Sequence, residues 1–141
     1  MKTPWKPWHE VVKLRDDLRS GDLPMHMFAA DLYEVMMQRG KRPIYEKTEH
    51  FFALTFPTYN LRHLVRDVVL RLAGKNDKAV RQLALTYGGG KTHTLITLRH
   101  LVTDPENLPN LPAVAEFVQE IGERPPPCRV AGLCFDKLDV E

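Results

Sequence analysis

The sequence has 141 residues, of which 43% are hydrophobic and 27% charged, and these values are ordinary for a folded globular domain. The formal net charge of +2 excludes the strongly basic character of a dedicated nucleic-acid-binding protein. No apolar stretch is long enough to span a membrane, and the N-terminus has no apolar run of signal-peptide length. We therefore expect a cytoplasmic protein of single-domain size with no membrane partner.

Residues 1–80 show the apolar spacing of helices. Val11, Leu14 and Leu18 would share one helical face, and a second helix is predicted over 25–38. The first part of the chain is therefore predicted to be a helical N-terminal region.

The clearest helical pattern lies over residues 61–73, where apolar side chains recur every three or four positions. Asn60 is placed to cap the start of this helix and Gly74 to end it. Its opposite face carries Asp67 among three arginines. We interpret that face as solvated, with DNA binding through the arginines as a weaker alternative: Arg62, Arg66 and Arg71.

Four aromatic side chains gather within residues 51–59: Phe51, Phe52, Phe56 and Tyr59. Such rings could stack on nucleic-acid bases. Because they lie beside the strongest amphipathic helix, we predict instead that they pack in the core.

Residues 81–141 change period. The segment 82–87 alternates apolar and polar side chains as a strand does, and 91–102 returns to helical spacing. A short helix is predicted over 113–121, and the mostly apolar run at 129–135 is typical of a strand buried on both faces. The predicted fold class is therefore α/β, in which the helical region is followed by the opening βαβ unit of a parallel sheet.

The apolar run at the end of the chain also contains the two cysteines, Cys128 and Cys134. Six steps of extended chain hold them about 20 Å apart, which is beyond bridging distance. We expect two small, reduced, buried thiols, as is typical of a cytoplasmic protein.

Three consecutive glycines separate the predicted strand from the predicted helix: Gly88, Gly89 and Gly90. Their N–H groups are unshielded, and the first amides of the helix add to them, so the junction suits a polyphosphate. Lys91 would place its ammonium on the β- and γ-phosphates, and Thr92 would place its hydroxyl on Mg²⁺. The backbone amide of His93 would lie near the next phosphate. The sequence thus predicts a Mg²⁺–nucleotide site.

The same residues resemble a Walker A motif, whose pattern is G-x-x-x-x-G-K-[ST]. Gly90, Lys91 and Thr92 match its second half. The first glycine of the pattern would fall at Leu85, so the loop would leave its strand by a different turn.

The chain also resembles the beginning of a family of large, poorly characterised prokaryotic ATPases of the AAA+ type. The resemblance is carried first by the glycine-triplet loop, LTYGGGKTHTLITLRHL at 85–101. Four further stretches also carry it: KPWHEVV at 6–12, FAADLYEV at 28–35, FFALTFPTYNLRHL at 51–64 and RVAGLCFDKLDVE at 129–141. It implies ATP as the ligand and further ATPase domains or subunits as partners. It also implies a setting beside DNA methylases or helicases in restriction or phage-defence clusters, so that DNA is approached only indirectly.

Catalytic residues are harder to assign. Asp136 follows the apolar run and has the position of a Walker B aspartate, although we favour an ordinary strand-end carboxylate. No glutamate follows it directly, since the next residue is Lys137, so we expect little hydrolysis from this chain alone. His93 and His100 lie seven positions apart on one helix face, too far for one metal ion, and we interpret His93 as a polar spectator.

Two alternatives stay open. The chain could be a non-enzymatic interaction module or a remnant, whose helical N-terminus binds a partner. It could also be a small self-contained phosphotransferase that uses Asp136.

Overall fold

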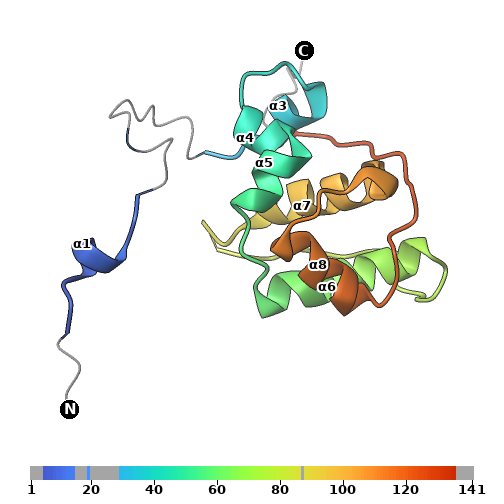
Figure 1. Cartoon of the computed structure of the whole chain (residues 1–141). Helices are drawn as coiled ribbons and strands as arrows, with labels where there is room; N and C mark the ends of the chain where they lie inside the picture. The colour runs from blue at the N-terminus through green and yellow to red at the C-terminus, as the bar shows by residue number, and fades with distance from the viewer. Residues whose placement is uncertain (1–4, 15–18, 20–28, 87, 136–141) are drawn as a thin grey trace.

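The structure is a computed structural model that describes residues 5–14, 19, 29–86 and 88–135. Its elements follow one another as shown in Figure 1: α1 (Trp8–Val11), α3 (Leu32–Met37), α4 (Pro43–Glu46), α5 (Thr48–Ala53), α6 (Tyr59–Leu72), α7 (Lys91–Thr103), the 3-10 turn η2 (Pro105–Asn107) and α8 (Pro112–Ile121). Helix α6 packs along α8, and α7 lies between this pair and the short helices α3, α4 and α5.

The predicted α/β fold class is wrong, because the described residues contain no β-strand and no sheet. The segments predicted as strands are 82–87 and 129–135, and their described residues form no strand pairing with each other or with another described segment. Alternating and apolar patterns indicate that the side chains of a segment suit a strand. A strand also requires a neighbouring strand that pairs with its backbone hydrogen-bonding groups. The predicted βαβ unit is therefore absent from the described part of the chain.

The final apolar run differs further from the prediction of a strand buried on both faces. Val130, Leu133 and Phe135 are exposed to 40%, 73% and 78%. The predicted burial of the thiols is also wrong, since Cys128 and Cys134 are half-buried, although they form no disulfide. A backbone hydrogen bond of 2.7 Å from Cys128 N to Val102 O ties this segment to the end of α7.

The helix predictions agree better with the structure. The predicted 61–73 helix is α6, which begins two residues earlier because the Thr58 hydroxyl, rather than Asn60, accepts the Leu61 amide at 3.4 Å. The predicted 91–102 and 113–121 helices are α7 and α8. Gly122 follows α8 with a φ of +82°, a left-handed conformation in which a glycine ends a helix at little cost.

The predicted 25–38 helix is shorter in the structure. Residues 25–28 lie outside the described part of the chain, and α3 begins at Leu32. Asp31 caps it, because its carboxylate accepts the Glu34 amide at 3.3 Å.

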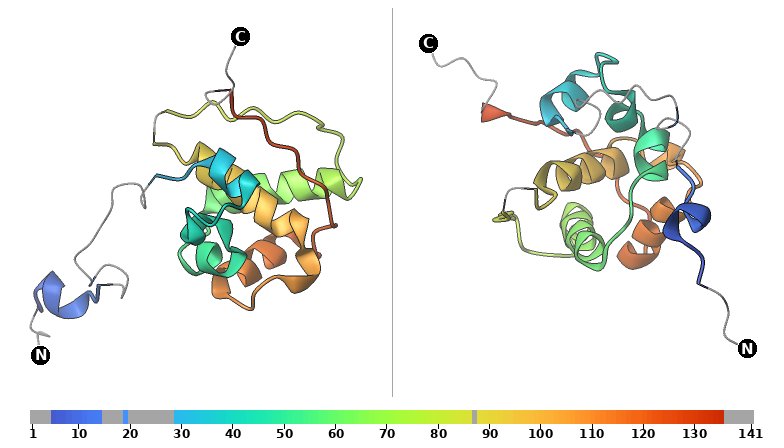
Figure 2. Two further views of the ribbon diagram at one scale, coloured as in Figure 1. Left: turned by 90° about the horizontal axis from the view of Figure 1, so that it is seen from above. Right: turned by 90° about the vertical axis from the view of Figure 1, so that its left-hand side faces the viewer.

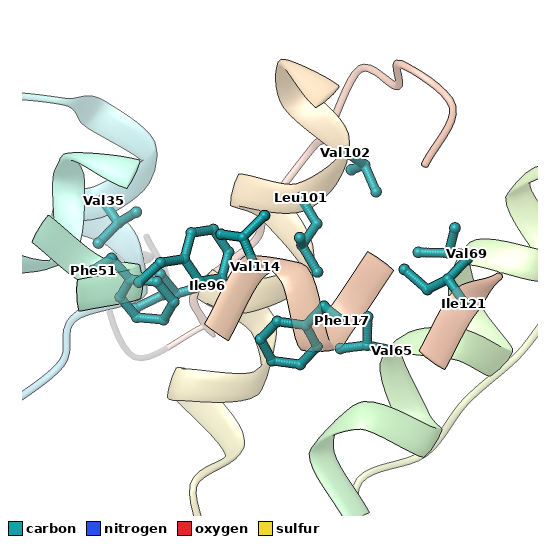
Figure 3. Packing of buried hydrophobic residues seen from close by; sticks show 11 residues of the cluster. Val35, Phe51, Val65, Val69, Ile96, Leu101, Val102, Val114, Phe117 and Ile121 are labelled. Atoms are coloured by element: carbon teal, nitrogen blue, oxygen red, sulfur yellow. The ribbon is translucent and has the colours of Figure 1, made fainter. Parts of the chain in front are cut away.

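One buried hydrophobic cluster joins α3, α5, α6, α7 and α8. Figure 3 shows Val65 of α6 beside Phe117 of α8, with Phe51 of α5 on the far side of the cluster. Of the four aromatic rings predicted to lie in the core, Phe51 and Phe52 are buried, since each is only 1% exposed. Phe56 and Tyr59 are exposed, so the prediction was wrong for these two. The cluster takes residues from both sides of position 80, and the predicted division there stays a prediction.

The N-terminal arm, residues 5–14, has no buried side chain and stands apart from the helices that form the core (Figures 1 and 2). The predicted shared face is not formed: Val11 and Leu14 are 61% and 62% exposed, and Leu18 lies outside the described residues. None of the helices in the described ranges is both long and apolar enough to cross a bilayer.

Candidate nucleotide-binding site

The glycine triplet forms a turn that leads directly into α7, at one edge of the helical bundle (Figure 2). Gly88 and Gly90 have φ values of +77° and +82°, which L side chains rarely adopt. Gly89 has no such angle, but a Cβ there would lie 2.9 Å from Leu85 Cβ and 3.0 Å from Thr86 O. Each of the three positions therefore requires glycine, for two different physical reasons.

At the N-terminus of α7, beside this turn, the first three backbone amides have no hydrogen-bond acceptor inside the helix. The first hydrogen bond of the helix runs from Thr94 N to Gly90 O at 2.9 Å, so the amides of Lys91, Thr92 and His93 have no acceptor within the helix. No side chain caps them, since the N-cap is Gly90. Free amides and the positive end of the helix dipole together favour an anion at this position.

The ammonium of Lys91 lies on the same turn. Lys91 Nζ donates to Leu85 O at 2.8 Å and to Thr86 O at 3.0 Å, which are the carbonyls just before the glycines. The side chain thus already folds back over the loop. A phosphate that approached the amides would compete with these two carbonyls for the ammonium.

The hydroxyl of Thr92 differs from the other threonine hydroxyls of α7. Those of Thr94, Thr97 and Thr103 each donate to the carbonyl four residues earlier, at 2.7–2.9 Å. No such bond is found for Thr92 Oγ1 among the described residues. In a phosphate-binding loop, a threonine hydroxyl at this position can bind a cation beside the phosphate.

The imidazole of His93 points away from the loop and into the interface with α5. Its Nε2 lies 3.2 Å from Thr55 Oγ1, and its ring packs on Phe51 with centroids 4.6 Å apart. The Thr55 hydroxyl itself donates to Phe51 O at 2.8 Å, so it accepts from His93 Nε2–H. Burial lowers the pKa of His93, which keeps the ring neutral.

His100 repeats this arrangement two turns later. Its Nδ1 lies 3.0 Å from Thr48 Oγ1, its Nε2 donates to Tyr45 O at 2.8 Å, and its ring packs on Phe51 at 5.1 Å. Burial lowers the pKa of His100, the hydrogen bond to Tyr45 opposes this, and nearby Arg99 lowers it further. Two histidines of α7 therefore hold Phe51 between them.

Sequence reasoning missed these roles. It placed His93 by its backbone amide alone and gave His100 no role. A signal was present, because histidines seven apart on one helix face can line up against a second helix. The interface partners, Thr48 and Thr55, carried no pattern that pointed to them.

The remaining predicted site residues are dispersed. Asp136 lies outside the described residues, so the structure does not place it. Arg62 pairs with Glu116 of α8 at 2.9 Å and with Glu120 at 3.7 Å, and the Arg71 guanidinium donates to Asn76 O at 3.0 Å. The arginine face of α6 is thus partly neutralised by acids of α8. The residues described hold no group of three or more His, Cys, Asp or Glu side chains suited to a metal ion.

Comparison with known proteins adds a family. The model of one family, described as the DUF499 N-terminal domain, matches residues 7–125. No curated protein and no solved structure matches the chain. The match includes residues 7–14 of the N-terminal arm, the five helices that build the core and the glycine turn.

Proposed function

The chain belongs to the DUF499 family, of which it carries the N-terminal domain, and on that premise we propose that it binds Mg–ATP at the start of α7. Gly88, Gly89 and Gly90 bring the backbone to the phosphates, Lys91 neutralises their charge, and Thr92 binds Mg²⁺. The backbone amide of His93 donates to the next phosphate.

The observation that carries the proposal is the conformation of the glycine turn. Two of its residues have positive φ and the third has no room for a Cβ. A 13-residue helix follows immediately, with a lysine at its first position and three amides that have no acceptor inside the helix. Such a turn exposes backbone N–H groups without side chains in the way. A turn that served only to reverse the chain would need neither three glycines nor a following lysine.

Magnesium fits the same site. Mg²⁺ is usually held by one or two protein oxygens together with phosphate oxygens and water, and Thr92 Oγ1 supplies such an oxygen. Bound Mg²⁺ would neutralise charge on the phosphates. The proposal concerns binding, because hydrolysis also requires a group that orients water and an acid that holds the metal.

The setting that we propose follows from the resemblance of residues 85–101 to AAA+-type ATPases. In this proposal the chain is the N-terminal segment of such an ATPase in a restriction or phage-defence system, and its protein partners are further domains or subunits of that ATPase. The helical region 29–73 then positions the nucleotide loop.

Replacement of Lys91 tests the proposal. Lys91→Ala removes a cation from the phosphates, and a charge-assisted hydrogen bond of about 1.5–3 kcal/mol corresponds to a loss of about tenfold or more in affinity. We expect the Kd for a fluorescent ATP analogue with Mg²⁺ to rise by that factor, as measured by anisotropy titration. Lys78→Ala is the matched control, because Lys78 is exposed and lies in the preceding loop, away from the glycine turn.

Equal affinity in the wild type and in Lys91→Ala would sink the nucleotide proposal. That outcome would favour the second candidate, a non-enzymatic interaction module. A specific observation supports this candidate: the arm exposes Trp5 and Trp8 to 98% and 76%, and large aromatic side chains are enriched at protein interfaces.

A further inference from the structure

His93 takes part in two separate contact regions, one through its backbone amide and one through its side chain. Its backbone amide is one of the three at the start of α7 that have no acceptor inside the helix, and its side chain contacts Phe51 and Thr55. It is the third residue of the helix, so a rotation of the first turn of α7 about the helix axis would move its side chain and these amides together.

We propose that His93 is a positioning residue for the nucleotide loop, and that its hydrogen bond to Thr55 couples nucleotide binding to the docking of α5 on α7. This inference rests on the proposed nucleotide site. The proposed nucleotide site is thus regulated through α5, a helix that supplies no group that binds the phosphates.

The geometry of the hydrogen bond supports a directed contact. Thr55 is 7% exposed, and its hydroxyl proton is used by Phe51 O, which leaves only its lone pairs for His93. His93 must therefore present Nε2–H, and the Phe51 ring fixes the plane of the imidazole at a tilt of 33°. Phe51 lies in α5, and Thr55 lies two residues beyond its end and is tied to it by the hydrogen bond to Phe51 O. A displacement of α5 therefore removes both partners of His93 at once.

Coupling of this kind is reciprocal. If docked α5 holds the amides of α7 in the arrangement that binds phosphate, then bound nucleotide must stabilise docked α5 by the same free energy. Nucleotide should therefore slow the exchange of amide hydrogens in α5, although α5 does not contact it. A histidine that only filled space in the core would not give this link.

The test uses the full chain and two threonines of the same stretch. Thr55→Val removes the acceptor for His93 and keeps the shape of the side chain, whereas Thr55→Ser keeps the hydroxyl. Thr48→Val is the matched control, because it removes the equivalent partner of His100, two turns from the loop. Affinity for a fluorescent ATP analogue with Mg²⁺ and the melting temperature are measured for each variant.

We expect Thr55→Val to raise the Kd about threefold to tenfold, the loss typical of one hydrogen bond. Thr55→Ser and Thr48→Val should stay within about twofold of the wild type, although Thr48→Val also lowers the melting temperature. An unchanged Kd in Thr55→Val overturns the inference. An equal rise in Thr55→Val and Thr48→Val also overturns it, because general destabilisation would then explain both.

Two further measurements complete the design. If Thr55→Val does not fold, hydrogen exchange in the wild type decides: slower exchange at Phe51 and Phe52 with the ATP analogue supports the coupling, and unchanged exchange overturns it.

Lys91→Ala separates the two proposals. If its affinity is lost while Thr55→Val binds normally, the coupling fails and the nucleotide site stands. If it binds as the wild type does, the nucleotide site fails first.

Discussion

The pH dependence of stability follows from two neutral rings, His93 and His100. Burial lowers the pKa of each below the ordinary histidine value. Unfolding exposes them and restores a pKa of about 6.5. Between that value and the lowered pKa values of the folded state, the unfolded chain binds more protons than the folded chain. Below about pH 6.5 the free energy of unfolding therefore falls as the pH drops. Above that pH the two rings do not lower the free energy of unfolding.

Thermal melting at about pH 7.5 and about pH 5.5 measures this effect. We expect a lower melting temperature at the acid pH. His93→Gln should show a smaller drop, because glutamine does not titrate in this range. If wild type and His93→Gln lose the same number of degrees, the lowered pKa of His93 does not contribute.

Sequence reasoning could identify the residues of the glycine turn but not the partners of the histidines. The need for glycine at 88–90 is local, since it arises from backbone angles and from atoms only three or four residues away. The contact between His93 and Thr55 joins positions 38 apart. Its existence depends on how α5 packs on α7, which no local pattern encodes.

At the scale of elements, helices were predictable because their hydrogen bonds are internal. The apolar spacing over 61–73 and 91–102 was enough to find α6 and α7, and the errors were at the caps. The strand predictions failed because an alternating pattern such as that at 82–87 does not specify a partner strand. The run at 129–135 passes beside α7 as an extended chain instead. A strand is a property of a pair of segments, whereas a helix is a property of one.

The packing of α6 against α8 gives a prediction at this scale. Phe117 is 0% exposed and lies in the cluster with Val65 of α6. Phe117→Ala should lower the free energy of unfolding by about 3–5 kcal/mol, through lost burial and the cavity that remains. Phe56→Ala makes the same change at a ring that is 80% exposed, so it should cost far less. Urea denaturation of both variants measures the difference, and equal losses would contradict the packing shown in Figure 3.

For the whole molecule, membership of the DUF499 family and the buried cluster describe the same unit, because the matched residues 7–125 contain every member of that cluster. The sequence predicted the glycine turn in a parallel sheet, whereas in the structure it lies at the edge of a helical bundle. The proposed site survives this correction because its groups come from the turn and from α7 alone. Its phosphate-binding amides need a helix, not a sheet, behind them.

The N-terminal arm has a consequence for optical measurements on this protein. Both tryptophans of the chain, Trp5 and Trp8, lie in the arm and are exposed to water, whereas the core contains none. Intrinsic tryptophan emission therefore reports the surroundings of the arm and not the state of the bundle. We expect heating to abolish far-ultraviolet circular dichroism in a cooperative transition while the wavelength of the emission maximum barely moves. A cooperative red shift at the same temperature would show that the arm is packed against the body. A blue shift when another macromolecule is added would instead report that the indole rings have left water, because the bundle contributes no tryptophan emission.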